Sequence, residues 1–204
     1  MNLALPIPTK ESTMETVSIQ ERQHPLRARY KTEPGAAWVT DYARTRSSDP
    51  RDPLHFIVEP KQGSGVQLPV GVHGAVGGLH DAPCPGDILC AALAACQDSS
   101  IRMVANLLGV ELASLTVEVT AEVDVRGALG MDPQVPVGFQ ALRCDVHLSA
   151  QEGTPPELLA KLRMGAERCC VVLQTLRQPP SVQVAFHEGG LSERTPEAPS
   201  PSRP

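Results

Sequence analysis

Cysteine is the residue type in this sequence best suited to chemistry, because its thiolate is a nucleophile and can change oxidation state. The chain contains six cysteines, namely Cys84, Cys90, Cys96, Cys144, Cys169 and Cys170. Six are too few for a disulfide scaffold in a chain of 204 residues, and four of them lie in apolar, helix-like stretches. We therefore expect reduced or reactive thiols and a cytoplasmic protein.

Cys96 is the main candidate because of its position in the stretch PCPGDILCAALAACQDSSIRMVANLLG. It lies where a run of small residues meets a polar segment, and a buried thiol at such a junction can face a pocket. The alternative is that it only packs, since a cysteine in an apolar helix is usually a small core residue. Packing is the interpretation for Cys90 and Cys144, and Cys84 is interpreted as a turn residue.

Two thiols in one site could reduce a peroxide. Attack of a thiolate on the outer peroxide oxygen gives a sulfenic acid, which a second thiol traps as a disulfide before further oxidation. The two Cα atoms must come within about 7 Å, and two packed helices can supply this approach. An apolar lining of Leu93, Met103 and Phe139 would favour alkyl hydroperoxides as substrates.

The stretch from Pro83 to Gly109 is predicted to form a long buried helix that carries Cys96. Pro85 suits the first helical position, Asp87 places a carboxylate beside the positive helix start, and Gly109 suits a left-handed stop. The helix is apolar on nearly all sides apart from a short polar break, which is typical of burial in a core.

The other segments predict antiparallel strands and one further helix, from residue periods of two and of three to four. The expected elements are a hairpin over 26–46, a strand pair 54–60 and 66–78, a second pair 115–126 and 138–150, a helix over 155–176 capped by Thr154, and a strand over 181–188. The fold class is therefore α+β, with an antiparallel sheet packed on the long central helix and a second helix.

Length and composition favour one domain over residues 21–188, between a flexible leader (1–20) and a disordered Pro/Ser-rich tail (189–204). The net charge is −5 and charges of both signs are mixed along the chain, so no basic surface indicates nucleic acid. There is no uninterrupted run of 18 apolar residues and no charged leader before an apolar run. Neither nucleic acid nor a membrane is an expected partner.

The segment GGLHDAPCPGDILCAALAAC, followed by AERCCVVLQTL and a terminal strand, resembles the OsmC/Ohr family of thiol-dependent hydroperoxide reductases. That family has a proline-containing turn, an acidic residue near a helix start, an Ala/Leu-rich run ending in Cys, and a later Cys usually followed by Pro and Val. The resemblance covers roughly residues 71–186. It implies that Cys96 attacks the peroxide, that Cys169 is the second cysteine and that Asp87 is the acidic residue. Cys170 stands where the family usually has proline, which makes it the other candidate for the partner thiol.

The family also places an arginine upstream of the first cysteine to polarise the peroxide, and this sequence has no arginine between Arg51 and Arg102. His73 and His80 are candidates for this role. Arginines of the N-terminal segment, from the same subunit or a partner, are further candidates, namely Arg27, Arg29, Arg44 and Arg46. At the level of sequence these alternatives stay open.

No cofactor or metal is expected. His80, Cys84 and Cys90 lack the close Cys-x-x-Cys pairing typical of structural zinc sites.

Two classes of function follow. The first is a peroxidase that reduces organic hydroperoxides through Cys96 and Cys169 and that is itself reduced by a dithiol or a lipoylated protein, as the resemblance implies. The second is a non-peroxidatic relative that binds a small apolar ligand or acts as a redox sensor. A homodimer that exchanges strands is expected, because the N-terminal strands have few large apolar residues and the resemblance implies such an exchange.

Overall fold

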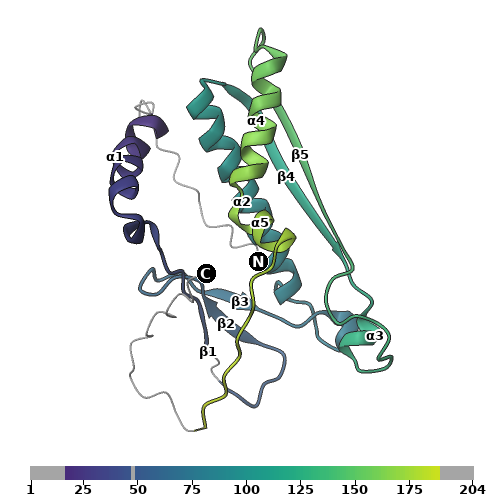
Figure 1. Ribbon diagram of the computed structural model, residues 1–204. Coiled ribbons are helices and arrows are strands. Elements are labelled where there is room, and N and C mark those ends of the chain that lie inside the picture. The colour runs from purple at the N-terminus through teal and green to yellow at the C-terminus, as the bar shows by residue number, and fades with distance from the viewer. Residues whose placement is uncertain (1–16, 47–48, 189–204) are drawn as a thin grey trace.

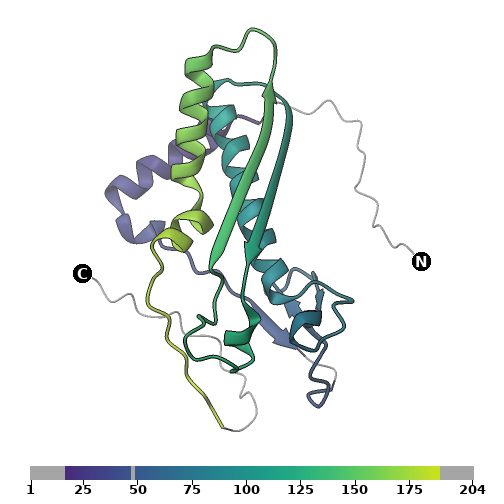
Figure 2. The same ribbon diagram turned by 90° about the vertical axis from the view of Figure 1, so that its right-hand side faces the viewer.

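The computed structural model describes residues 17–46 and 49–188, and its central element is the helix α2 (Pro85–Leu108). One side of α2 packs against the strand β4 (Leu112–Glu122) and the helix α4 (Pro156–Cys169). Figures 1 and 2 show α2 and α4 side by side along one face of a long two-stranded ribbon. The predicted α+β class, with antiparallel strands packed on a long central helix and a second helix, is confirmed.

The two-stranded ribbon consists of β4 and β5 (Ala141–Ala150), which are antiparallel. The register pairs Leu112 with Ala150 at one end and Glu122 with Ala141 at the other. Half-buried and exposed residues alternate along most of β4, as expected for a strand with one solvated face. The predicted strand pair is confirmed over these residues.

The strand predicted over 115–126 ends earlier than expected. The strand β4 stops at Glu122, and the short helix α3 (Val125–Ala128) occupies the predicted strand end. The Asp124 carboxylate accepts a hydrogen bond from the backbone N–H of Arg126 at 3.1 Å. A side-chain cap of this kind favours a helical turn over continuation of the strand.

The helix α2 has the predicted ends, with Pro85 in its first turn and Gly109 in the left-handed conformation (φ 67°) after its last. Its burial is one-sided. The buried residues are Leu93, Gln97, Ser100, Ile101 and Ala105. Ala91, Ala92 and Ala95 are exposed. The expectation of a helix buried all round is therefore wrong for the single chain, since other elements cover only one side.

Among the described residues, α2 is also the one helix long and apolar enough to cross a membrane by length and composition. The core helices of soluble proteins pass the same test, and α2 packs on β4 and α4. The expectation that no membrane is a partner stays a prediction.

The core lies between α2, β4 and α4. Its buried cluster comprises Ile101, Ala105, Val110, Leu162 and Ala166. Gly165 allows the two helices to approach closely, because a Cβ added there would lie only 2.9 Å from Cγ1 of Val104 on α2. The position of α4 on α2 thus depends on a missing side chain.

The second predicted helix is not continuous, because it is broken at Cys170. The helix α4 ends at Cys169, and α5 (Val171–Arg177) begins after Cys170, whose backbone is extended (φ −75°, ψ 100°). Two β-branched residues, Val171 and Val172, follow the break, and such residues are less favourable in helices.

The start of α4 also differs from the prediction. The N-cap is Pro155 rather than Thr154, whose hydroxyl donates to the backbone carbonyl of Gln151 at 2.6 Å.

The predicted hairpin over 26–46 is wrong, because residues Ile19–Thr32 form the helix α1. The Ser18 hydroxyl accepts a hydrogen bond from the backbone N–H of Glu21 and so caps the helix start. None of the α1 residues is buried, so the alternating pattern did not reflect a half-buried strand. The helix also begins inside the predicted leader, of which residues 1–16 lie outside the described part of the chain.

A small antiparallel sheet follows α1. Its strands, in the order β1-β2-β3, are β1 (Arg44–Arg46), β2 (Phe56–Glu59) and β3 (Leu68–Val70), and the 3₁₀ turns beside it are η1 (Pro34–Ala37) and η2 (Gly74–Val76). The pairing of β2 with β3 confirms the centre of the predicted strand pair 54–60 and 66–78.

The segment 178–188 forms neither helix nor strand, so the strand predicted over 181–188 is absent from the single chain. Its side chains Val182, Val184 and Phe186 are 83%, 74% and 93% exposed. Within the described residues no strand pairs with this segment. The predicted disordered tail, 189–204, lies outside the described residues.

Gly165→Ala is expected to destabilise the fold by roughly 1–3 kcal/mol, although alanine is the better helix former. The added Cβ would lie 2.9 Å from the stiff, β-branched Val104. Met164→Ala, at the exposed neighbouring position, should change the free energy of unfolding by less than about 0.5 kcal/mol. Chemical denaturation measures both, and a Gly165→Ala variant as stable as the wild type would show that the two helices are not in close contact.

Candidate functional site

Cys96 lies on α2 at the point where the start of α5 meets it. Its Sγ accepts a hydrogen bond from the backbone N–H of Val172 at 3.5 Å. This contact joins the middle of α2 to the first turn of α5.

Cys170 is the cysteine that the structure brings to Cys96. It is 0% exposed, and this burial is the main cause that raises the pKa of its thiol. A hydrogen bond from the backbone N–H of Leu173 lowers this pKa, and the neighbouring Cys96 thiol raises it. The Cys144 thiol on β5 raises the same pKa slightly. Cys170 therefore lies in a buried environment that contains other thiols.

Cys169, by contrast, is exposed at the end of α4. The break between α4 and α5 separates the two vicinal residues, because the extended backbone of Cys170 turns its side chain inward while Cys169 completes the helix. The geometry therefore brings Cys170, and not Cys169, to Cys96.

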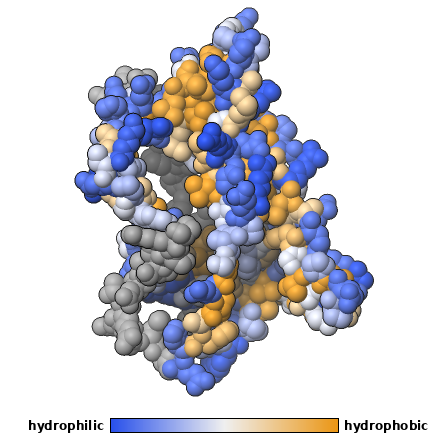
Figure 3. All heavy atoms as spheres, in the orientation of Figure 1, coloured by the Kyte–Doolittle hydropathy of each residue, from blue (hydrophilic) through white to orange (hydrophobic). Residues whose placement is uncertain are grey.

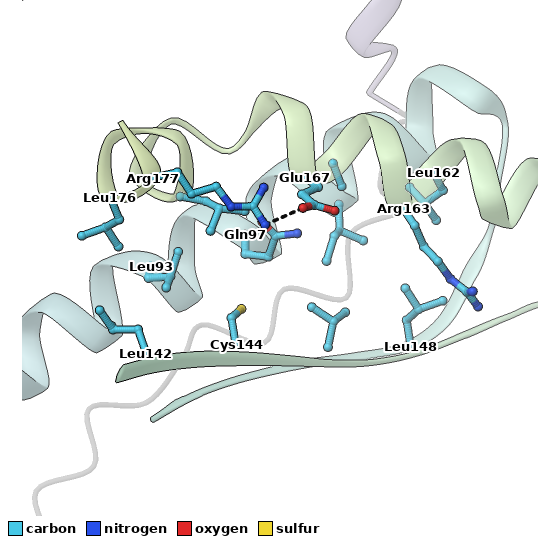
Figure 4. Close-up of a pocket in the computed structure, with 14 residues that line it drawn as sticks. Leu93, Gln97, Leu142, Cys144, Leu148, Leu162, Arg163, Glu167, Leu176 and Arg177 are labelled. Atoms are coloured by element: carbon cyan, nitrogen blue, oxygen red, sulfur yellow. Dashed lines mark ion pairs between the residues drawn. The ribbon is translucent and has the colours of Figure 1, made fainter. Parts of the chain in front are cut away.

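A cavity of about 490 Å³ lies between α2, β5, α4 and α5 (Figure 4). Cys144 is among its lining residues, whereas Cys96 and Cys170 are not. Its lining is mostly apolar, with Leu93 on α2 and Leu142 on β5 among the lining residues. Gln97, the residue after Cys96, is 7% exposed, and its Oε1 has no hydrogen-bond partner. A buried carbonyl oxygen without a partner, next to a cavity, is a suitable acceptor for a bound molecule.

The charged side chains of this cavity come from α4 and α5. Arg177 and Glu167 form an ion pair at 2.6 Å, drawn as a dashed line in Figure 4, and Arg163 lies further along the lining. Both arginines follow Cys96 in the sequence, so a search upstream of that cysteine could not find them.

The N-terminal arginines considered from sequence are engaged elsewhere in the single chain. Arg44 and Arg46 both contact the Glu59 carboxylate, at 2.7 and 3.7 Å. Arg29 pairs with Glu33, and Arg27 donates to the side chain of Gln23.

Asp87, His73 and His80 form a separate cluster at the other end of α2. The Asp87 carboxylate contacts His80 Nε2 at 2.9 Å and accepts from the backbone N–H of Cys84 at 2.8 Å. The His80 hydrogen bond is the largest cause that lowers the Asp87 pKa to about 2, followed by the contacts with Cys84. The His73 ring lies 4.3 Å from that of His80. Because Asp87 and Cys96 are nine residues apart on one helix, this cluster lies about 13 Å from Cys96 along the axis.

This cluster borders a second cavity, of about 810 Å³, whose lining includes Phe139. The apolar lining proposed from sequence is therefore divided. Leu93 borders the first cavity, Phe139 borders the second, and Met103 is exposed on α2. Four residues of β5 line the first cavity, namely Leu142, Cys144, Val146 and Leu148. The alternation in the sequence already placed these four on one face of the strand, so it could have indicated where this cavity lies.

Residues 78–185, more than half of the chain, match the sequence family described as OsmC-like protein. The chain belongs to the OsmC-like protein family. No curated protein matches the chain in sequence.

Solved structures of OsmC-like proteins share this fold. An OsmC-like protein from Mycoplasma pneumoniae has a TM-score of 0.53 at 12% identity, over 69% of this chain and 89% of that chain. An organic hydroperoxide resistance protein OsmC from Legionella pneumophila has a TM-score of 0.50 at 22% identity, over 70% and 92%. An organic hydroperoxide resistance protein from Elizabethkingia anophelis has a TM-score of 0.51 at 19% identity, over 70% and 91%. At these identities the likeness shows the OsmC-like fold alone.

Asp87→Asn is expected to remove a pH-dependent part of the stability. The Asp87 pKa of about 2 lies below its ordinary value of 3.8, so the carboxylate stabilises the fold above that value and the contribution is lost as the pH falls through about 2. The difference in unfolding free energy between wild type and variant should be full at neutral pH and should shrink between about pH 4 and pH 2. Denaturant unfolding across this range measures it, and a constant difference would contradict the expected role.

Proposed function

We propose that this OsmC-like protein is a thiol-dependent peroxidase that reduces organic hydroperoxides, with Cys96 as the attacking thiol and Cys170 as its partner. Family membership supports a redox or peroxide-related role. The observation that carries the finer proposal is the meeting of Cys96 with the buried Cys170 where α2 meets α5. The proposal replaces Cys169 of the sequence analysis by its neighbour, because Cys169 is exposed.

The position of α5 supports Cys170 rather than Cys169 as the counterpart of the family's second cysteine. The family's second cysteine is usually followed by proline, and proline favours the first position of a helix. In this chain the first residue of α5 is Val171, directly after Cys170. By its place directly before the first residue of α5, Cys170 matches that second cysteine better than Cys169 does.

The reaction balances with these two thiols and an external dithiol. The Cys96 thiolate attacks the outer oxygen of the hydroperoxide, the O–O bond breaks, and the alkoxide leaves as the alcohol after gaining a proton. Cys96 is then a sulfenic acid. The Cys170 sulfur attacks the Cys96 sulfur, water is released, and a disulfide remains. A dithiol or a lipoylated protein, the reductant class that the family resemblance implies, then returns both thiols.

The first cavity, whose lining includes Gln97, the residue after Cys96, is the proposed site for the alkyl hydroperoxide. Its apolar walls suit an alkyl chain, and Arg177 is the candidate cation for the peroxide oxygens, because it lines the cavity together with Gln97. A reducing, cytoplasmic location is part of the proposal.

A second candidate function is binding of a small apolar ligand without turnover, or redox sensing in the same cavity. The observation that favours it is the buried Gln97 Oε1, which lacks a partner and would accept a hydrogen bond from a ligand with one polar group.

Three serine variants separate these possibilities in an assay of cumene hydroperoxide consumption with a dithiol. Cys96→Ser should abolish consumption, because a hydroxyl does not ionise at neutral pH as a thiol does. Cys170→Ser should complete one attack, leave a sulfenic acid on Cys96 that a dimedone reagent traps, and fail in multiple turnover. Cys169→Ser is the matched control and should turn over like the wild type.

Peptide mapping after one equivalent of hydroperoxide gives the decisive result. A Cys96–Cys170 disulfide is expected. A Cys96–Cys169 disulfide would contradict the choice of partner. Wild-type protein that consumes no hydroperoxide, with Cys96 unlabelled in every variant, would reject the peroxidase and support the ligand-binding alternative.

We also propose that the functional form is a homodimer that exchanges strands. Figure 3 shows apolar side chains, in orange, at the surface of the face that carries α2, α4 and the β4–β5 ribbon. The exposed small residues of α2 would let a second backbone approach closely. The alternating segment 181–186 exposes Val182, Val184 and Phe186, as a strand without its neighbour would.

The dimer is tested by light scattering at micromolar concentration. The wild type should have the mass of two chains, since an exchanged interface should bury well over about 2,000 Å². Phe186→Asp should shift the protein towards the monomer, whereas Met131→Asp, at another exposed apolar residue outside this segment, should not. A monomeric wild type would reject the proposal.

A further inference from the structure

The cluster at the N-terminal end of α2 contains three side chains of types that bind metals, and the thiol chemistry does not use it. We propose that His80, Cys84 and Asp87 form a binding site for one divalent transition metal of the zinc class. The proposal concerns a different part of the molecule from the Cys96–Cys170 pair and does not depend on the peroxidase function.

The ligand atoms already lie close together. A nitrogen of His80, the Sγ of Cys84 and a carboxylate oxygen of Asp87 are all within 4.8 Å of one another, and His80 Nε2 is 2.9 Å from Asp87 Oδ2. Zinc bound tetrahedrally at its usual ligand distances separates its ligand atoms by about 3.3–3.8 Å. Small side-chain rotations are therefore enough to close the site around an ion.

The backbone of the preceding loop holds His80 in place. The N–H of Gly71 donates to the carbonyl of Pro83 at 3.1 Å, and the N–H of His80 donates to the carbonyl of Val72 at 2.9 Å. The loop is so tight that a Cβ added at Gly78 would lie 2.0 Å from the Val72 carbonyl oxygen. His80 itself has a φ of 51° and is the one non-glycine residue with positive φ in the described part of the chain. A bulky residue in this strained conformation is a common feature of binding sites.

The chemistry of the three groups selects the class of metal. Thiolate, imidazole and carboxylate together suit zinc and similar ions, whereas calcium and magnesium prefer oxygen ligands alone. Cys84 is 7% exposed at the N-cap of α2. Asp87 lies in the first turn of the same helix, three residues after Cys84.

The fourth position of the site is left to water or an external ligand. His73 is near, but its Nδ1 accepts a hydrogen bond from the backbone N–H of Ala75 at 3.0 Å, so the other ring nitrogen carries the proton in the neutral imidazole. His73 could bind a metal only by losing that contact. Asp87 and Cys84 border the cavity of about 810 Å³, from which a small molecule could reach the open position.

Titration of the reduced full-length protein with Co²⁺ tests the site, because a bound thiolate gives a sulfur-to-cobalt charge-transfer band, and competition by Zn²⁺ then gives the zinc affinity. One equivalent should bind with that band. Cys84→Ser should abolish the band, and His80→Asn should weaken binding at least about a hundredfold, since loss of even an outer-shell partner costs 10–100-fold. Asparagine tolerates the left-handed backbone of residue 80, so this variant should keep the loop fold.

Cys90→Ser is the matched control, because Cys90 lines the same cavity without belonging to the cluster, and it should bind like the wild type. A band that persists in Cys84→Ser but disappears in Cys96→Ser would overturn the proposal by placing the metal on the redox pair. Absence of binding in a wild-type protein that is folded by circular dichroism would overturn it outright.

Discussion

The close packing of α4 on α2 is the constraint on which the rest of the structure depends. Leu162 and Ala166 are fully buried against Ile101 and Ala105, and Gly165 removes the side chain that would hold the helices apart. Interiors packed at this density have few alternative arrangements. The β4–β5 ribbon covers the adjacent side of the same pair, so the position of every cysteine in the site follows from this contact.

The interruption of the helix at Cys170 brings the start of α5 to Cys96. If the helix ran on without interruption, Cys169 and Cys170 would differ only by a 100° rotation about one axis. The extended residue at 170 instead starts a new helix, whose second N–H reaches the Cys96 sulfur. The same change of direction places Arg177 over the cavity beside Gln97. A single backbone irregularity thus brings Cys96 and Cys170 together and places Arg177 in the lining of an apolar cavity.

The start and the middle of α2 carry different groups. The middle carries the half-buried thiol of Cys96, next to Gln97 in the lining of a largely apolar cavity. The start carries an imidazole, a thiol and a carboxylate held by a tight glycine-containing loop, with two of the three groups exposed. About 13 Å of helix separates Asp87 from Cys96, so the resemblance that joined them as one site grouped residues that the single chain keeps apart.

The sequence by itself determined α2, the β4–β5 pair and the family, because these depend on periodicity, helix caps and a local motif, all of which are written in contiguous residues. It also singled out Cys96, which ends the Ala/Leu-rich run, and the role of Cys96 as the attacking thiol stays a prediction. Only the tertiary structure decided that Cys170 rather than Cys169 meets Cys96, since two adjacent cysteines have the same local signal and differ only in how the broken helix packs. It likewise decided that the segments 26–32 and 181–188 are not strands in the single chain, because alternation predicts a strand only where another strand is available to pair with it. The cluster of His80 and Asp87 with Cys84 depends on a loop that folds back on itself, and no spacing along the chain records that contact.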